Sequence, residues 1–199
     1  MLALHGVFTA LITPFKKGAL DLDALKRLTE RQLKAGVHGL VPLGSTGEVA
    51  ELIARELGEV DVRDVSGVQP GDFLTADLLI LGTPTWDDGD LQQDWVSFFP
   101  KLDGIDLTGR KVALFGLGNA FSFPGQFANG LRKLHQKVVE RGATAIGFWP
   151  VDGYTFHASE AVVDGRFCGL VLDQENDPAK TPERVAAWVA QIREEAGLD

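Results

Sequence analysis

The chain has 199 residues, 45% of them hydrophobic, which is enough to bury one core, and its single cysteine, Cys168, excludes an internal disulfide and a cysteine-rich metal site. Its 28 acidic residues outnumber its 19 basic ones, giving a net charge of −9, and without a cluster of Lys and Arg this excludes nucleic-acid binding. No apolar run is long enough to span a bilayer, and the N-terminus shows no signal peptide, so we expect a soluble, cytoplasmic protein with no membrane contact.

The first third of the chain alternates apolar runs, typical of buried strands, with patterns typical of amphipathic helices. The first helical pattern carries leucines at helical spacing and ends at Gly36. Residues 60–65 alternate apolar and charged side chains, as an edge strand does. We expect strands at residues 6–12, 39–43 and 60–65, and helices at residues 21–35 and 49–58.

The rest of the chain repeats this alternation, which is typical of a parallel sheet covered by helices on both faces. Two apolar runs are expected to be its central strands, at residues 78–81 and 112–115. Residues 152–180 form a long irregular region, and such regions are commonly functional or hold an inserted element. We expect a further strand at residues 143–149 and helices at residues 91–99, 127–141 and 182–196, the last of them capped by Thr181.

Two loops that follow the central strands carry aromatic side chains. Trp86 lies in the loop after the first strand, and Phe123 lies in the Gly-rich loop after the second. Ligands bind at the carboxyl ends of the strands in open α/β sheets, so we expect these loops to form two walls of one slot. A Gly-rich turn at residues 44–47 precedes a helical pattern, an arrangement that holds phosphate on backbone N–H groups. These features together indicate a flavin nucleotide site.

From about residue 46 to residue 199 the chain resembles the long-chain flavodoxins. The resemblance implies a three-layer, doubly wound α/β fold with a parallel sheet, and it equates the long irregular region with the insertion that distinguishes the long-chain members. It is carried by VAELIA at residues 49–54, LILGTPTW at 79–86, LTGRKVALFGLG at 107–118 and AVVDGRF at 161–167.

Residues 1 to about 48 resemble a different family, dihydrodipicolinate synthase and related pyruvate-dependent aldolases, which are (β/α)₈ barrels (TIM barrels). The matching runs are GVFTALITPF at residues 6–15 and GLVPLGSTGE at residues 39–48. We interpret the chain as an engineered chimera, because the join falls inside a shared motif; a natural fusion is the less favoured alternative. We expect one domain of residues 1–199, in which a barrel segment, 1–48, adds an N-terminal βα unit to a flavodoxin segment, 49–199. The sheet is expected to have six parallel strands, residues 60–65 among them.

The flavodoxin resemblance implies FMN as the cofactor of a one-electron carrier. No catalytic residue is expected, and the scattered histidines indicate no metal ligand. Trp86 would stack on one face of the flavin ring, and Phe123 stands on the other side, where the family usually has tyrosine. Asn119 stands where the family often has aspartate, and Gln126 where it often has asparagine. The implied cofactor-binding residues are Gly44, Ser45, Thr46, Gly47, Thr83, Pro84, Thr85, Trp86, Leu117, Gly118, Asn119, Phe123, Gln126 and Asp152.

The phosphate loop departs from the family pattern. Flavodoxins place a few more residues, including a second threonine, between the Thr-Gly pair and the helix, whereas here Glu48 follows Gly47 directly. A carboxylate this close would repel a phosphate dianion by roughly one to a few kcal/mol. We therefore expect weakened FMN binding in preference to abolished binding.

Several alternatives stay open at this stage. The chain is either an FMN protein or a folded chimeric scaffold with no cofactor and no activity. Aldolase activity is not expected, because the Schiff-base lysine and the proton-relaying tyrosine belong to later barrel strands, and Tyr154 is the single tyrosine. The acidic surface either steers a basic redox protein partner or only keeps the protein soluble. A monomer is expected, with a swapped dimer as the fallback.

Overall fold

The computed structural model describes residues 8–10, 15–16, 19–20, 39–41, 45–58 and 60–198. It divides into two compact units, residues 1–48 and 49–199, and each is described by itself. The prediction of one domain stays a prediction.

Within its described residues, the first unit contains two short strand pairs. In one of them β1 (Phe8–Ala10) lies parallel to β4 (Gly39–Val41), and in the other β2 (Phe15–Lys16) lies antiparallel to β3 (Ala19–Leu20). β1 and β4 fall inside the predicted strands at residues 6–12 and 39–43. The helix predicted at residues 21–35 lies outside the described residues.

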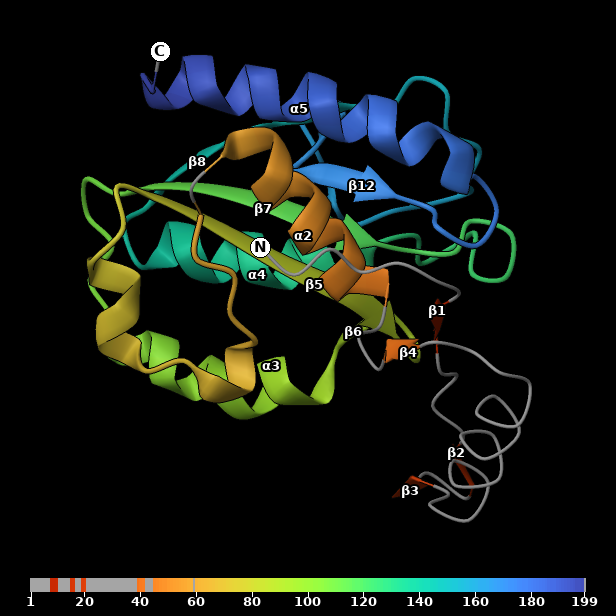
Figure 1. Ribbon diagram of the computed structural model, residues 1–199, viewed down its shortest axis with the longest axis horizontal. Helices are drawn as coiled ribbons and strands as arrows, with labels where there is room; N and C mark the ends of the chain where they lie inside the picture. Colours follow the sequence, from red (N-terminus) through yellow and green to blue (C-terminus); the bar gives the residue numbers. More distant parts are fainter. Residues whose placement is uncertain are drawn as a thin grey trace. The chain divides into compact units, whose positions relative to one another are not determined.

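The second unit is built on a five-stranded, mostly parallel sheet (Figure 1). Its central strand β7 (Lys111–Leu117) pairs along its whole length with β5 (Leu78–Trp86). On its other edge β7 pairs first with β8 (Thr144–Ile146) and then with β12 (Leu170–Leu172). Two segments distant in sequence therefore share one strand position, and residues 147–169 are inserted between them.

The inserted residues form a small antiparallel sheet of their own. Its strands are β9 (Trp149–Pro150), β11 (Arg166–Phe167) and β10 (Val162–Val163). The main sheet is left at Gly147, which has φ 75° and whose added Cβ would lie 2.7 Å from the indole Nε1 of Trp188. For this reason the predicted strand at residues 143–149 ends early, at Ile146. The prediction that the long irregular region holds an inserted element is confirmed by the small sheet.

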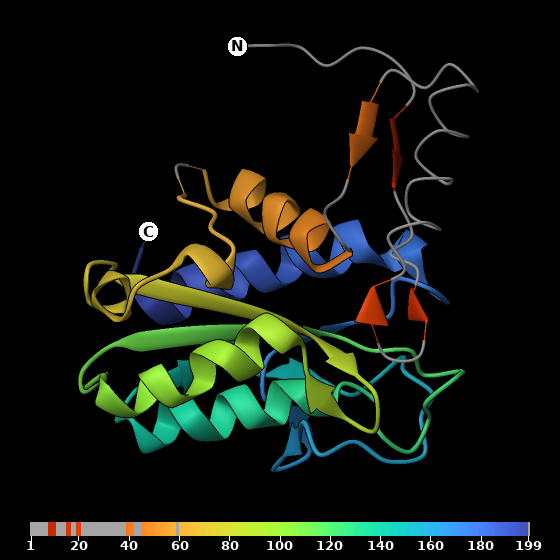
Figure 2. The same cartoon turned by 90° about the horizontal axis from the view of Figure 1, so that it is seen from below.

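Helices cover both faces of the sheet (Figures 1 and 2). α3 (Gln93–Phe98) and α4 (Asn129–Glu140) lie on one face of the sheet. On the other face lie α5 (Thr181–Ala196) and the part of α2 (Ser45–Leu57) that belongs to the second unit, from Val49 onward. The strand β7 shows why two cores form, since Val112 and Leu114 belong to the α3 and α4 side while Ala113 and Phe115 belong to the α2 and α5 side. The three-layer α/β prediction is confirmed for this unit.

The strand predicted at residues 60–65 is wrong. Residues 60–64 have no regular secondary structure, and Val65–Gly67 form the 3-10 helix η1. The carboxylate of Asp64 accepts hydrogen bonds from the backbone N–H of Ser66, at 2.8 Å, and from the Ser66 hydroxyl. Such a local bond competes with a strand ladder, and it starts a turn where alternation alone indicated a strand. The five strands of the described sheet do not include this segment.

The bounds of α3 and α5 differ from the predicted ones for reasons that their contacts show. α3 is shorter than predicted because Leu91 belongs to β6 (Asp90–Leu91), Gln92 caps the helix, and Phe99–Gly104 continue as the 3-10 helix η3. α5 includes Thr181, whose hydroxyl donates to Gln174 Oε1 at 2.9 Å in place of capping the helix. The remaining short helices are η2 (Pro70–Leu74) and η4 (Pro178–Lys180). Among the described residues, every helix is too short or too polar to cross a membrane.

Candidate functional site

The candidate site begins where β5 and β7 end side by side. Their parallel register continues to Pro84 opposite Leu117, so the segments that follow both strands leave the sheet at the same edge. The structure thus brings together the predicted residues from Thr83 to Trp86 with Leu117 and Gly118. Thr83 is fully buried and its hydroxyl donates to the Pro84 carbonyl at 2.9 Å, so its side chain belongs to the core.

Trp86 sits at the end of a strand and not in an open loop. β5 runs on to Trp86 and returns through a tight turn to β6, with Trp86 opposite Asp90. Asp87 and Gly89 have positive φ values of 45° and 93°, and the Gly89 N–H donates to the Trp86 carbonyl at 3.1 Å. The turn holds the backbone of Trp86 while its side chain stays 39% exposed, an unusual exposure for a large aromatic residue.

The second aromatic loop follows β7. Gly118 is required at its start, because an added Cβ would lie 2.7 Å from the backbone nitrogen of Ala128. The Gly118 N–H donates to the Leu172 carbonyl at 3.1 Å, so this N–H is not available to a ligand. The Phe123 N–H donates to the Asn119 carbonyl at 2.9 Å, and the ring of Phe123 is 51% exposed. Gln126 closes the loop through its N–H, which donates to the Phe123 carbonyl at 3.2 Å.

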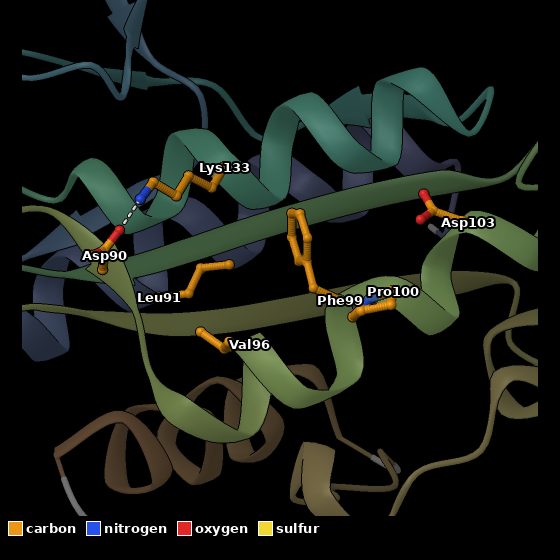
Figure 3. A pocket seen from close by; sticks show the side chains of 7 residues that line it. All are labelled: Asp90, Leu91, Val96, Phe99, Pro100, Asp103 and Lys133. Carbon is orange, nitrogen blue, oxygen red and sulfur yellow. Dashed lines mark hydrogen bonds and ion pairs between the residues drawn. The ribbon is translucent and has the colours of Figure 1, made fainter.

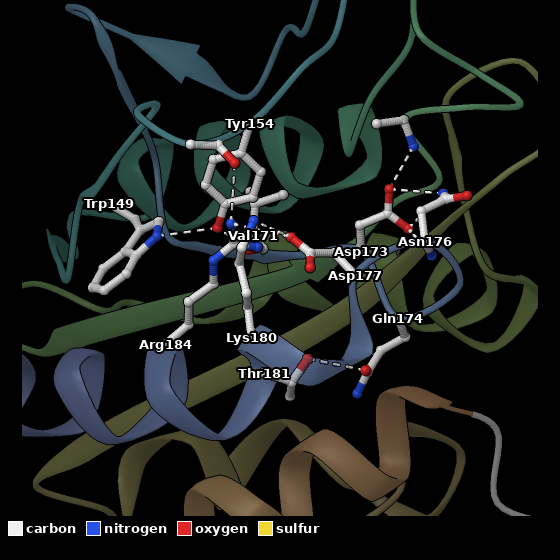
Figure 4. A network of polar contacts seen from close by, with 12 residues as sticks. Trp149, Tyr154, Val171, Asp173, Gln174, Asn176, Asp177, Lys180, Thr181 and Arg184 are labelled. Atoms are coloured by element: carbon white, nitrogen blue, oxygen red, sulfur yellow. Dashed lines mark hydrogen bonds and ion pairs between the residues drawn. The ribbon is translucent and has the colours of Figure 1, made fainter.

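A polar network behind this loop was missed by the sequence analysis (Figure 4). Asp173 follows β12, is 5% exposed, and accepts a hydrogen bond from the Ala120 N–H at 2.9 Å. The side-chain amide of Asn176 donates to both oxygens of Asp173 at 2.9 Å and to Asn119 Oδ1 at 3.0 Å. The available signal was an aspartate directly after the apolar run that ends at Leu172, at the same sheet edge as the two aromatic loops.

The predicted phosphate residues are helical. Ser45, Thr46 and Gly47 form the first turn of α2, and Gly44 lies outside the described residues. The helix therefore begins four residues earlier than predicted, and Glu48 lies in its first turn. An acidic side chain at this position is stabilised by the positive end of the helix dipole. The first N–H groups of a helix have no partner within the helix, so this turn can offer donors to an anion. Ser45 is exposed, and Thr46 and Gly47 are half-buried.

Asp152 lies in the inserted region, two residues after the end of β9, and is exposed. Nearby, the Trp149 Nε1–H donates to the hydroxyl of Tyr154 at 3.1 Å, and that hydroxyl donates to the Val171 carbonyl (Figure 4). The Arg184 guanidinium lies 3.9 Å from the centre of the Tyr154 ring. Burial raises the pKa of Tyr154 to about 12, so this tyrosine stays protonated at neutral pH and fixes the insertion against β12.

A separate groove of about 320 Å³ lies between α3, η3 and α4 (Figure 3). Its apolar side chains are Leu91, Val96, Phe99 and Pro100. Asp90 and Asp103 lie at opposite ends, paired with Lys133 and Lys137 respectively. Neither Trp86 nor Phe123 lines this groove, so the geometry of the aromatic loops alone defines the candidate site.

A doubly wound α/β unit with two exposed aromatic side chains at the carboxyl ends of adjacent central strands defines a flavodoxin-like protein. The family model described as "Flavodoxin" matches residues 43–188. The chain belongs to the flavodoxin family.

Individual relatives agree with this assignment. The chain is 41% identical over 163 residues to the flavodoxin of Synechocystis, covering 80% of this chain and 96% of the relative. It is 42% identical over 159 residues to Flavodoxin 1 of Escherichia coli, covering 78% and 90%. Among solved structures it resembles Fusobacterium nucleatum flavodoxin bound to flavin mononucleotide, with a TM-score of 0.72, 36% identity, and coverage of 76% of this chain and 91% of that one.

A second family model, described as "Dihydrodipicolinate synthetase family", matches residues 3–63. The two matched ranges overlap at residues 43–63, which include the predicted Gly-rich turn and α2. The interpretation of the chain as two joined family segments is therefore consistent with both matches.

Proposed function

We propose that the chain binds FMN between Trp86 and Phe123 and works as an electron carrier. The observation that carries the proposal is the adjacency of the two aromatic loops, which the register of Pro84 opposite Leu117 sets at one sheet edge. The residues present fit the group, because two large rings stay exposed there, 39% and 51%, where a planar heterocycle would cover them. When bound, the cofactor supplies the one-electron chemistry, and the protein supplies binding and orientation.

The residues around the rings divide the remaining tasks. The backbone carbonyl of Gly118 and the backbone groups of Thr83, Thr85 and Leu117 are assigned to the ring edge and the ribityl chain. Further ring-side contacts are assigned to the side chains of Asn119, Gln126 and Asp152. Pro84 shapes the start of the Trp86 segment, where it lies opposite Leu117.

The phosphate is assigned to Gly44, Ser45, Thr46 and Gly47. The support for Ser45, Thr46 and Gly47 is the helical first turn of α2, whose leading N–H groups suit an anion. Glu48 in the same turn opposes a phosphate through charge, so we infer that FMN binds more weakly than a loop without this carboxylate would allow.

An aldolase activity is not proposed. The hydroxyl of Tyr154 is engaged by Trp149 and Val171, and it is not free to relay protons. Lys111 donates to the carbonyls of Glu195 and Ala196, and Lys133 and Lys137 form ion pairs with aspartates. None of these described lysines is the desolvated amine that Schiff-base chemistry requires.

The partner is inferred to be a basic redox protein. Asp87, Asp88, Asp90 and Asp94 cluster around the Trp86 turn, the first three with exposed side chains, and the whole chain carries a net charge of −9. Complementary charge accelerates encounter, and the effect falls as salt increases. A monomeric state and a cytoplasmic location stay predictions of the sequence.

A flavin titration tests the proposed function. FMN is titrated with the purified protein, and its fluorescence is expected to fall as the rings of Trp86 and Phe123 cover the flavin. Riboflavin, which lacks the phosphate, separates the ring contacts from the phosphate contacts. Absence of quenching for both flavins at high micromolar protein would leave the alternative, a folded scaffold without a cofactor.

A further inference from the structure

Asp173 is a buried carboxylate that takes part in none of the ion pairs found among the described residues. Burying a charge is costly unless hydrogen bonds replace the lost water. Here the replacement comes from three N–H groups: the backbone N–H of Ala120 at 2.9 Å, the backbone N–H of Asn176 at 3.1 Å, and the side-chain amide of Asn176 at 2.9 Å. Both carboxylate oxygens are used as acceptors.

Two of these contacts reach into the aromatic loop after β7. The Ala120 N–H belongs to that loop, and the Asn176 amide continues to Asn119 Oδ1 at 3.0 Å. The same Asn119 oxygen accepts from the Ser122 N–H at 2.7 Å. The backbone carbonyl of Asn119 accepts from the Phe123 N–H at 2.9 Å. A continuous set of hydrogen bonds therefore leads from Asp173 to the backbone of Phe123.

A purely local role would not require this set. A turn after β12 is already closed by the Asp177 N–H, which donates to the Asp173 carbonyl at 2.9 Å, and by the Asn176 N–H on the Asp173 side chain. The bonds to Ala120 and Asn119 cross to a different loop, more than 50 residues away in sequence. Their effect is to fix the loop that presents the half-exposed Phe123 ring.

We propose that Asp173 and Asn176 are positioning residues for the flavin ring: they hold the Asn119–Phe123 loop in the conformation that receives it. The inference rests on the proposed function. A ligand gains affinity when the groups that contact it are held in place before binding, because less conformational entropy is lost on association. Neither side chain is assigned a contact with the flavin.

The test compares three variants with the parent protein. Asp173→Asn keeps the volume of the side chain. Both carboxylate oxygens of Asp173 accept N–H groups, so the NH₂ group of the asparagine would face another N–H donor. Asn176→Ala removes the bridge to Asn119 from an exposed side chain and leaves the Ala120 contact in place. Asp177→Asn is the matched control: it makes the same charge change in the same turn, but its carboxylate pairs with Lys180 and Arg184.

Two measurements are made on each variant at a temperature where circular dichroism shows it folded. Amide hydrogen exchange of Ala120 and Ser122 in the flavin-free protein reports on the loop itself. Dissociation constants for FMN and for riboflavin report on binding. For Asp173→Asn we expect about tenfold faster exchange and about tenfold weaker binding of both flavins, since a buried unsatisfied group commonly costs this factor. Asn176→Ala is expected to show about threefold effects, and Asp177→Asn none.

Equal factors for FMN and riboflavin support ring positioning, since a phosphate effect would spare riboflavin. Folded Asp173→Asn with parent-like affinity for both flavins would overturn the proposal. If Asp173→Asn does not fold, Asn176→Ala decides the question by the same criteria. If the parent itself binds neither flavin, the proposed function fails and the positioning role falls with it, whereas a parent that binds and variants that bind equally well reject the positioning role alone.

Discussion

The ring of Phe115 lies directly over Gly82: an added Cβ at Gly82 would fall 2.0 Å from Cζ of that ring. The two residues are also opposite each other in the parallel register of β5 and β7. Close packing of this kind leaves no room for a methyl group, so glycine is required where the chain approaches the site edge.

Replacing this glycine therefore tests the packing. We expect Gly82→Ala to lower the free energy of unfolding by about 1–3 kcal/mol, the usual cost of overpacking a core. Urea unfolding measures the change. Gly71→Ala is the matched control, since nothing lies within 4 Å of its added Cβ, and equal effects of the two substitutions would contradict the packing observed at Phe115.

The stacking role of Trp86 gives a prediction about affinity. Trp86→Ala is expected to weaken FMN binding by about tenfold or more, because it removes one wall of the ring slot. Phe121→Ala is the control: Phe121 is 85% exposed in the same loop as Phe123 and is not assigned to the site. Fluorescence titration gives both dissociation constants. Stronger dependence on Phe121 than on Trp86 would place the flavin elsewhere.

Because Glu48 lies in the first turn of α2, we expect its charge to affect the binding of the FMN phosphate and not of the flavin ring. Glu48→Gln is expected to tighten FMN binding by roughly two- to fivefold at low salt and to leave riboflavin binding unchanged. Glu51→Gln, which removes an exposed charge in the same helix, is the control. A gain for riboflavin as large as the gain for FMN would show that the effect is not at the phosphate.

Tyr154 is the single tyrosine, so its titration can be followed by tyrosinate absorbance without assignment. Burial raises the pKa of Tyr154 from 10.0 to about 12 in the folded protein. Because the folded pKa lies above the unfolded one, this contribution to stability is complete below about pH 10 and is lost as pH rises through about 12. We expect the folded protein to titrate near the higher value and the protein in denaturant near the lower one. A folded midpoint near 10 would contradict the burial of this hydroxyl.

Much of the second unit could be predicted from its sequence because the signals are local. The apolar runs of β5 and β7 indicated buried strands, and the aromatic residues that follow them indicated a ligand edge. The loop position of Phe123 follows from the end of β7, whereas β5 runs beyond its predicted end and includes Trp86. The resemblance to flavodoxins in these same runs is confirmed by the family match.

Other features depend on contacts that a local pattern does not contain. Residues 60–65 have the alternation of a strand, but the Asp64 carboxylate bonded to Ser66 makes a turn instead. The apolar runs around Ile146 and Leu172 do not reveal that β8 and β12 share one edge of β7. Gly147 ends the first of them with a positive φ of 75°, and the indole of Trp188 occupies the space that a Cβ would need there.

The sequence by itself determined the central strands, the helices that cover both faces of the sheet and the residues that leave it at its carboxyl edge, since hydrophobic periodicity and turn residues act over a few positions. Only the tertiary structure decided how the aromatic loops are held. Asp173 reaches Ala120, 53 positions earlier in the sequence, because β12 and β7 lie side by side in register, and that pairing is set by the burial of the whole sheet. A buried carboxylate acquires its role from the neighbours that folding supplies.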